Sequence, residues 1–403
     1  LFNQRLYFAR LAGYEQTLAS RLITMSERTL NINNELLAAL LNEYFTPDAN
    51  IATDWQKVAC AIAATKGFSV ITGGPGTGKT TTVTKLLAIL QLIPESAQTI
   101  HRLLGVKPFT NKFRHNKANP LHLDVLIIDE ASMVDLSLMA KLIEALPAHA
   151  RLILLGDKDQ LASVDTGSVM SDLCQGLVLG QTPGYSPARC DELNNLCFNG
   201  EAKLIAQSNS AFKLADCIAF LQHSYRFDAQ SGIGQLALAV NTNNTGVLNY
   251  VEQESVEGRF KDVILDYDFI AKPIEKLVKS AASKYTHYLS LIAQGASVAE
   301  VHKAFASYQL LAAVREGDYG VNSLNQRIER VLQQQGLITL SPNQRHYTGM
   351  PIMVSQNDYQ LKLFNGDIGI LMPDESGQLK ALFIDEQGNQ RAFSPARLPA
   401  HDK

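Results

Sequence analysis

The sequence has neither a long hydrophobic run nor an excess of charge of one sign. Its apolar stretches fall short of the roughly 18 residues that a membrane-spanning helix needs, and no signal-peptide pattern opens the chain. The 36 Lys and Arg stand against 39 Asp and Glu, for a net charge of -3. This balance argues against a histone-like protein held on DNA by bulk positive charge, but it leaves room for a local basic groove.

Cysteine is scarce and is not arranged for metal binding. The chain has 5 cysteines, an odd number, and none of them forms a CxxC pair or a Cys/His cluster with the spacing of zinc ligands. Free thiols in a reducing interior compartment are therefore expected in place of a disulfide framework.

The 403 residues, 46% of them hydrophobic, are enough for two or three domains with cores of their own. Residues 1–48 are predicted to form a small helical module. Short continuous apolar runs at Phe68–Thr72, Val125–Ile128 and Leu152–Leu155 are separated by helical stretches. Such runs are typical of central strands in a parallel sheet covered on both faces, which predicts an α/β fold.

A further region is expected to begin near residue 216. Tyr308–Val314 is predicted as a strand and Val321–Leu332 as a helix. Beyond residue 335 come short β-like pieces with turns at Ser341-Pro342-Asn343 and Asn365-Gly366-Asp367. These pieces predict a small barrel-like insert.

The clearest motif is a glycine-rich turn between a predicted strand and a predicted helix. It reads Gly73-Gly74-Pro75-Gly76-Thr77-Gly78-Lys79-Thr80 and matches G-x-x-x-x-G-K-[ST]. Glycines let backbone N–H groups turn toward a phosphate chain, and the following helix directs its positive end there. We therefore expect ATP at residues 73–81, Thr81 included. Lys79 would neutralise the β- and γ-phosphates, and the Thr80 hydroxyl would bind Mg²⁺.

Two further strands end in polar residues. The run ending at Ile128 is followed by Asp129 and Glu130, a pair suited to holding magnesium (Asp129) and activating water (Glu130). The next strand leads into Gly156-Asp157-Lys158-Asp159-Gln160. The Gln160 amide can both donate to and accept from a γ-phosphate, although a plain Gly-Asp turn is the alternative.

In this order, the motifs resemble superfamily 1 DNA helicases, and among them the RecD-like group. The stretches that carry the resemblance are VITGGPGTGKTTTVTKLL, TIHRLLG, NPLHLDVLIIDEASMVDL, LILLGDKDQLASV, SYRF, SGIGQLA, YQLLAAVREGDYGV and LFNGDIGIL, spread over residues 53–400. The resemblance implies two RecA-like P-loop motor domains: an ATP-binding domain 1A at 49–215, and a domain 2A at 216–403 with an SH3-like insert at about 335–397. Residues 1–48 would then dock a partner.

The resemblance also implies an activity: ATP-dependent 5′→3′ movement along single-stranded DNA at a duplex end. The chain would be a subunit of exodeoxyribonuclease V with RecB-like and RecC-like partners, acting in break repair and recombination, with the nuclease site in another subunit. A P-loop switch that never unwinds DNA and a docked subunit without unwinding activity are the alternatives.

Site roles follow from the same resemblance. Lys79, Thr80, Asp129 and Glu130 keep the roles given above, and Gln160 becomes the γ-phosphate sensor. Arg226 becomes an arginine finger reaching from the second motor domain, and Gln56 the residue that reads adenine. From chemistry alone, an arginine beside Tyr225 is also typical of a surface or cation–π contact.

A basic stretch at Thr99–His122 is the candidate DNA path. It carries basic side chains, Phe109 and Phe113 but no acidic residue, and a single-strand channel needs such cations and aromatic faces. The candidate DNA contacts are His101, Arg102, Lys107, Lys112 and Arg114. A basic surface loop that binds nothing is the alternative.

Two departures from the family pattern stand out. Residues 94–98 are too short to hold the family's Thr-Gly-Lys segment, and the chain ends at Lys403 before the last motor motifs. It also begins without Met. We therefore expect a partial chain or a concatenation of ordered segments.

Overall fold

The computed structural model describes residues 8–46, 52–93, 97–107, 110, 112–160, 167–206, 214–226, 228, 230–264, 273–340, 346–358, 360–385 and 387–403. The chain divides into two compact units, Leu1–Ile264 and Leu265–Lys403. Each has hydrophobic clusters of its own. The predicted turn at 341–343 and the shortened segment at 94–96 lie outside the described residues.

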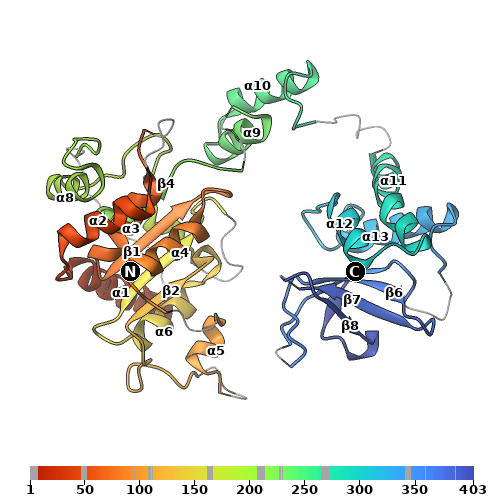
Figure 1. Cartoon of the computed structure of the whole chain (residues 1–403), viewed down its shortest axis with the longest axis horizontal. Helices are drawn as coiled ribbons and strands as arrows, with labels where there is room; N and C mark the ends of the chain where they lie inside the picture. The colour runs from red at the N-terminus through yellow and green to blue at the C-terminus, as the bar shows by residue number, and fades with distance from the viewer. Residues whose placement is uncertain are drawn as a thin grey trace. The chain divides into compact units, whose positions relative to one another are not determined.

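The first unit is built on a four-stranded sheet (Figure 1). Its strands are β1 (Phe68–Gly73), β2 (Val125–Ile128), β3 (Arg151–Gly156) and β4 (Ile218–Leu221), in the order β2-β3-β1-β4. All of the pairings are parallel. The three apolar runs predicted as strands are confirmed, and so is the parallel sheet.

Alternate residues of each strand enter different cores, as the period of two requires. Phe68 and Val70 of β1 lie in one cluster and Ile71 lies in the other. The first cluster is covered by α1 (Ala9–Glu27), α5 (Ile100–Leu104), α6 (Leu136–Ala145) and α7 (Val169–Leu173). The second is covered by α2 (Asn34–Tyr44), α3 (Trp55–Thr65), α4 (Lys79–Ile89) and α8 (Pro187–Phe198). Between strands and helices lie the short turns η1 (Ala131–Met133) and η2 (Ala215–Cys217).

The N-terminal helices are part of this unit. Leu22 of α1 packs in the first cluster and Leu41 of α2 in the second. The Arg28 guanidinium, just after α1, donates to the carbonyl oxygens of Ala148 (2.8 Å) and Ala150 (3.0 Å). A separate module at 1–48 was expected. Its described residues pack on both faces of the sheet instead, because strands buried on both sides need helices to cover them.

The predicted boundary at 215/216 falls inside the first unit. Strand β4 begins two residues after it and pairs with β1, with Val70 opposite Ile218. The unit then continues through α9 (Gly232–Asn241) and α10 (Thr245–Val256) to Ile264. Sequence periodicity did not indicate this pairing, which joins strands about 150 residues apart.

The second unit combines helices with an antiparallel sheet. The helices are α11 (Pro273–Ala293), α12 (Val298–Ala306) and α13 (Val321–Gln334), the last confirming the predicted helix. The strands are β5 (Pro351–Val354), β6 (Ile368–Pro373), β7 (Leu379–Ile384), β8 (Gln390–Phe393) and β9 (His401–Asp402), in the order β8-β7-β6-β5-β9. A 3-10 turn, η4 (Pro395–Arg397), lies between β8 and β9. The β pieces predicted beyond residue 335 are confirmed.

A parallel sheet was also expected in this second unit, with Tyr308–Val314 as one of its strands. The described residues of the unit form only the antiparallel sheet, and residues 308–314 are not a strand. Leu311 is 86% exposed and Val314 is 54% exposed. An apolar run becomes a buried parallel strand only beside a parallel neighbour, and none of the described strands here supplies one.

All five cysteines are free and buried. Burial raises the pKa of Cys174 and of Cys197 to about 12, because the thiolate would lose its hydration. These thiols stay protonated at neutral pH and serve as core packing. None of the described helices is long and apolar enough to span a membrane.

Candidate nucleotide site

The glycine-rich loop connects the end of β1 to the start of α4. Gly76 and Gly78 have φ angles of +76° and +78°, in the left-handed region that glycine tolerates. Gly78 precedes α4 and makes no side-chain cap. The first N–H groups of α4 are therefore left at the mouth of the loop, where an anion is favoured.

Lys79 and the threonines of the motif lie around this loop. The Lys79 ammonium donates to the carbonyl oxygens of Gly73 (2.5 Å) and Gly74 (3.3 Å). The Thr77 hydroxyl donates to the Gly74 carbonyl at 2.8 Å. Pro75 and the pair Thr80 and Thr81 are exposed to solvent. The predicted residues 73–81 thus form one continuous loop and first helical turn.

Asp129 and Glu130 lie at the same edge of the sheet as the loop. They follow β2, and β3 lies between β2 and β1. Because these strands are parallel, their carboxyl ends share one edge. Both carboxylates are exposed, and Asp129 Oδ1 accepts the N–H of Glu130 at 2.9 Å. Glu130 has a φ of +51°, so the chain turns sharply directly after the strand.

The turn after β3 carries Gln160 at this edge. The Asp157 carbonyl accepts the N–H of Gln160 at 3.3 Å, and Asp157 Oδ1 accepts the N–H of Asp159 at 3.0 Å. The Thr72 hydroxyl, next to the glycine loop, accepts the N–H of Lys158 at 3.1 Å. The turn is therefore fastened to β1, and the Gln160 side chain is exposed beside it.

Asp157 is a site residue that sequence reasoning passed over as part of a turn. It is 4% exposed. Burial raises the pKa of its carboxyl, an effect that the charge of Lys79 opposes. The available signal was an acidic residue directly after a fully apolar strand.

The segment after β4 packs on the glycine loop. The N–H of Tyr225 donates to the Gly76 carbonyl at 2.8 Å, and the Ser224 hydroxyl donates to the Pro75 carbonyl at 3.2 Å. A Cβ on Gly76 would stand 2.4 Å from Arg226 Cβ. Arg226 therefore belongs to the same unit as the loop, not to a second motor domain as the resemblance implied. Strand β4 lies beside β1, so its exit reaches the loop directly. Phe227 lies outside the described residues.

Gln56 closes the loop on another side. Its side chain is 8% exposed, and Nε2 donates to the Thr77 carbonyl at 3.1 Å. A small cavity beside it is lined by Thr53, Asp54, Trp55, Gln56, Thr77, Leu221, Gln222, His223 and Tyr225. The His223 and Tyr225 rings meet edge to face at 4.6 Å. Sequence reasoning missed these aromatic residues as site residues, although Tyr225 is the neighbour of Arg226.

The predicted DNA contacts lie on α5 and on a short hairpin after it. Val106 and Phe113 form a bridge, and the N–H of Lys107 donates to the Lys112 carbonyl at 3.1 Å. The His101 ring lies 5.9 Å from the Phe113 ring. Arg102 on α5 and Arg114 on the hairpin are also exposed. The structure thus brings all five candidates together, while residues 108, 109 and 111 lie outside its described part.

A metal at this edge would need ligands beyond acidic side chains. Among the described residues, no group of three or more His, Cys, Asp or Glu side chains could hold a metal ion. Thr80 and Asp129 are both exposed. Such a sparse donor set fits Mg²⁺, which keeps several waters and binds phosphate oxygens beside one or two protein ligands.

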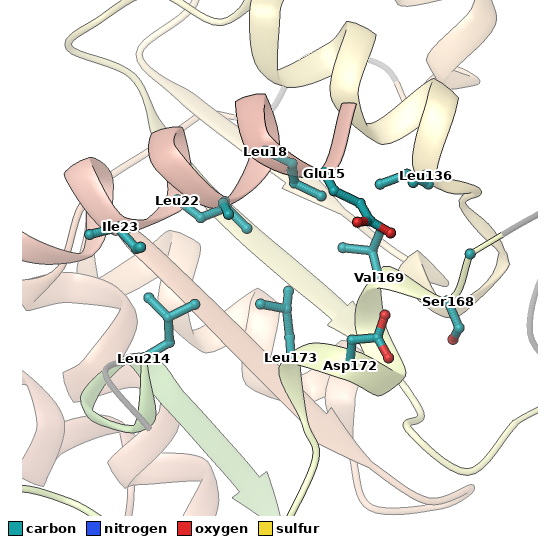
Figure 2. A pocket seen from close by; sticks show the side chains of 12 residues that line it. Glu15, Leu18, Leu22, Ile23, Leu136, Ser168, Val169, Asp172, Leu173 and Leu214 are labelled. Carbon is teal, nitrogen blue, oxygen red and sulfur yellow. The ribbon is translucent and has the colours of Figure 1, made fainter. Parts of the chain in front are cut away.

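A larger cavity of about 480 Å³ lies elsewhere in the first unit. Figure 2 shows its mostly apolar wall, with Leu18 and Leu22 of α1 facing Leu173 and Leu214. Two carboxylates, Glu15 and Asp172, stand at one end. The cavity shares no residue with the glycine loop, with Asp129 or with the segment after β4.

Comparison with known proteins gives four likenesses. The AAA domain family matches residues 92–166. The RecBCD enzyme subunit RecD of Haemophilus influenzae is 35% identical over 93% of this chain and 65% of that protein. The ATP-dependent RecD2 DNA helicase of Deinococcus radiodurans is 26% identical over 82% of this chain and 39% of that protein. Among solved structures, the Pif1 helicase from Bacteroides in complex with ADP-AlF3 and ssDNA aligns with a TM-score of only 0.35 at 16% identity, covering 91% of this chain and 75% of that one.

A parallel sheet with a glycine-rich loop at its carboxyl edge, followed along the chain by the AAA-domain match, is the arrangement of a P-loop domain, which implies ATP binding. More narrowly, the chain is similar to the RecD subunits of RecBCD enzymes, at 26–35% identity over most of its length. It spans slightly less than two thirds of the Haemophilus protein.

Proposed function

We propose that the chain is an ATP-dependent motor that moves 5′→3′ on single-stranded DNA as a RecD-like helicase subunit of exodeoxyribonuclease V. One observation carries the proposal: four chain segments with phosphate-directed chemistry meet at one edge of the first sheet. They are the loop at 73–81, the pair Asp129 and Glu130, the turn at 157–160 and the segment at 224–226.

Nucleotide binding would use the loop and the residues that pack on it. Lys79 would exchange its bonds to the Gly73 and Gly74 carbonyls for the β- and γ-phosphates. Gln56 and Tyr225, which both bond to the loop, would contact the adenine by hydrogen bonding and stacking.

Hydrolysis would use the remaining residues of the edge. Thr80 and Asp129 would hold Mg²⁺, which offsets phosphate charge when bound. Glu130 would orient and deprotonate the attacking water, and Gln160 would contact the γ-phosphate. Arg226 would approach the phosphates from within the first unit, because its segment is bonded to the loop through Tyr225 and Ser224.

DNA and partners would engage other parts of the chain. The basic hairpin with Phe113 suits single-stranded DNA, since charge follows the backbone and bases stack on rings. The second unit would belong to a second RecA-like motor domain, with the β5–β9 sheet as its SH3-like insert. RecB-like and RecC-like subunits in a bacterial cytoplasm would complete the enzyme, with α1 and α2 near the docking surface.

A docked subunit without unwinding activity is the second candidate. The antiparallel sheet, formed where a second parallel sheet was expected among the described residues, favours it. A P-loop switch that acts on protein would differ from both candidates, because DNA would not change its ATPase rate.

The test is the ATPase rate of the chain with and without oligo-dT, for the wild type, Lys79→Ala and Lys85→Ala. We expect oligo-dT to stimulate the wild type, and Lys79→Ala to lower kcat by about 10²-fold or more because the transferred phosphoryl loses its cation. Lys85 lies on the same helix over the Phe45 ring and should be dispensable. Undiminished hydrolysis by Lys79→Ala, with oligo-dT present, would refute the proposal.

A further inference from the structure

Asp157 is a buried carboxylate in the middle of the proposed ATPase edge. It follows β3, the strand between the glycine-loop strand β1 and the Asp129 strand β2. Its side chain is 4% exposed, and a carboxylate in such a place loses hydration that folding must offset. Nothing in the core of the sheet requires an acid there, since the four residues of β3 before Gly156, Leu152–Leu155, are apolar.

The side chain of Asp157 shapes the turn that carries Gln160. Its Oδ1 accepts the N–H of Asp159 at 3.0 Å, and its carbonyl accepts the N–H of Gln160 at 3.3 Å. The same turn is tied to β1 by the bond from the N–H of Lys158 to the Thr72 hydroxyl. The geometry of Gln160 and the start of the glycine loop therefore depend on one turn.

The charge of Asp157 acts on Lys79. Asp159 is paired with the Lys158 ammonium at 2.6 Å, so the charges of these two groups largely cancel each other. Gly156 lies opposite Thr72 in the pairing of β3 with β1, so Asp157 follows at the level of Gly73, whose carbonyl the Lys79 ammonium contacts at 2.5 Å. The Lys79 ammonium thus has a buried negative charge within reach, in addition to the two loop carbonyls that it contacts.

We propose that Asp157 is a positioning residue for ATP hydrolysis, which fixes the turn bearing Gln160 and holds the Lys79 ammonium at the edge between β1 and β3. The inference rests on the proposed ATPase function. Asparagine could accept the same N–H with a similar shape and without the cost of burying a charge. The negative charge is therefore the part of Asp157 that the turn itself does not need.

The experiment compares Asp157→Asn, Asp157→Ala and the matched control Asp124→Asn in the full chain with saturating oligo-dT. Asp124 directly precedes β2, at the opposite edge of the sheet from Asp129. For Asp157→Asn, kcat should fall about tenfold while KM for ATP stays unchanged or falls, because the lost interaction aligns Lys79 in the transition state. For Asp157→Ala, which also loses the acceptor in the turn, kcat should fall further. Asp124→Asn removes an exposed ion pair with His149 and should stay within about twofold of the wild type.

A second readout separates positioning from folding. Asp157→Asn should melt at the same temperature as the wild type or higher, because it removes a desolvated charge but keeps the hydrogen bond. A clearly lower melting temperature would show a structural role and overturn the inference. If Lys79→Ala is inactive but Asp157→Asn keeps the wild-type kcat, the inference is also overturned. The same holds if Asp157→Asn raises KM for ATP and leaves kcat unchanged. A wild type that hydrolyses no ATP would instead refute the proposed function.

Discussion

Two glycines of the phosphate-binding loop differ in what surrounds them. Gly78 has a φ of +78°, and a Cβ there would stand 2.2 Å from Gln56 Nε2. Gly74 is outside the left-handed region, and a Cβ there would meet nothing within 4 Å. The two positions therefore form a matched pair for testing how the loop is built.

We expect Gly78→Ala to lower the free energy of unfolding by about 1–2 kcal/mol, the usual penalty for a left-handed alanine. It should also weaken binding of an ATP analogue, because Gln56 must move. Gly74→Ala should leave stability within about 0.5 kcal/mol of the wild type. Urea unfolding and fluorescence titration measure both effects, and equal stability of the two variants would contradict the loop geometry.

At the scale of elements, helix α1 is bound to the first sheet through a buried stripe. Leu18, Leu22 and Met25 lie in the same cluster as Phe68 of β1. The last turn is followed by Arg28, whose guanidinium bonds two carbonyls just before β3. The helix therefore contributes to the stability of the P-loop unit as well as to any docking surface.

Leu22→Ala should destabilise the first unit by about 2–5 kcal/mol, because it leaves a cavity at a site that is 2% exposed. Leu36→Ala on α2 is the control, since that side chain is 56% exposed and its loss should cost about 0.5 kcal/mol or less. Chemical unfolding measures the difference. If Leu22→Ala matched Leu36→Ala, α1 would not be part of the core.

For the whole molecule, the separate cores of the two units have a thermodynamic consequence. One hydrophobic cluster lies entirely within residues 274–398, and the other two lie within the first unit. Since the glycine loop belongs to the first unit, a nucleotide bound at the proposed site would stabilise that unit directly. The second unit has no residue in the proposed nucleotide site.

Calorimetry should therefore resolve two unfolding transitions. An ATP analogue with Mg²⁺ should raise the midpoint temperature of only one of them. When the analogue is present at a hundred times its Kd, the free energy of unfolding of that unit should rise by about 2.7 kcal/mol. Ile352→Ala, at a fully buried position of β5, should lower the midpoint temperature of the other transition. Removing Mg²⁺ with EDTA should reduce the nucleotide effect. A single transition that responds to both changes would show that the units unfold together.

Local sequence was enough to predict the parts of the nucleotide site. A loop that faces a helix start follows from three local features: the glycines at 76 and 78, the apolar run before them and the lysine after them. The strands at 125–128 and 152–155 were found because a buried parallel strand must be continuously apolar. Asp129, Glu130 and Gln160 could be placed at one sheet edge for the same reason, although their catalytic roles stay predictions.

Tertiary structure decided what lies beside those parts. Which strands pair, and in what order, depends on closing long loops and burying both sheet faces, and neither is written in local periodicity. Only the pairing of β4 with β1 places Arg226 on the loop of its own unit, and only the position of β3 buries Asp157 near Lys79. The sequence by itself therefore determined which functional side chains the chain carries. The packing of distant segments decided which of those side chains lie together.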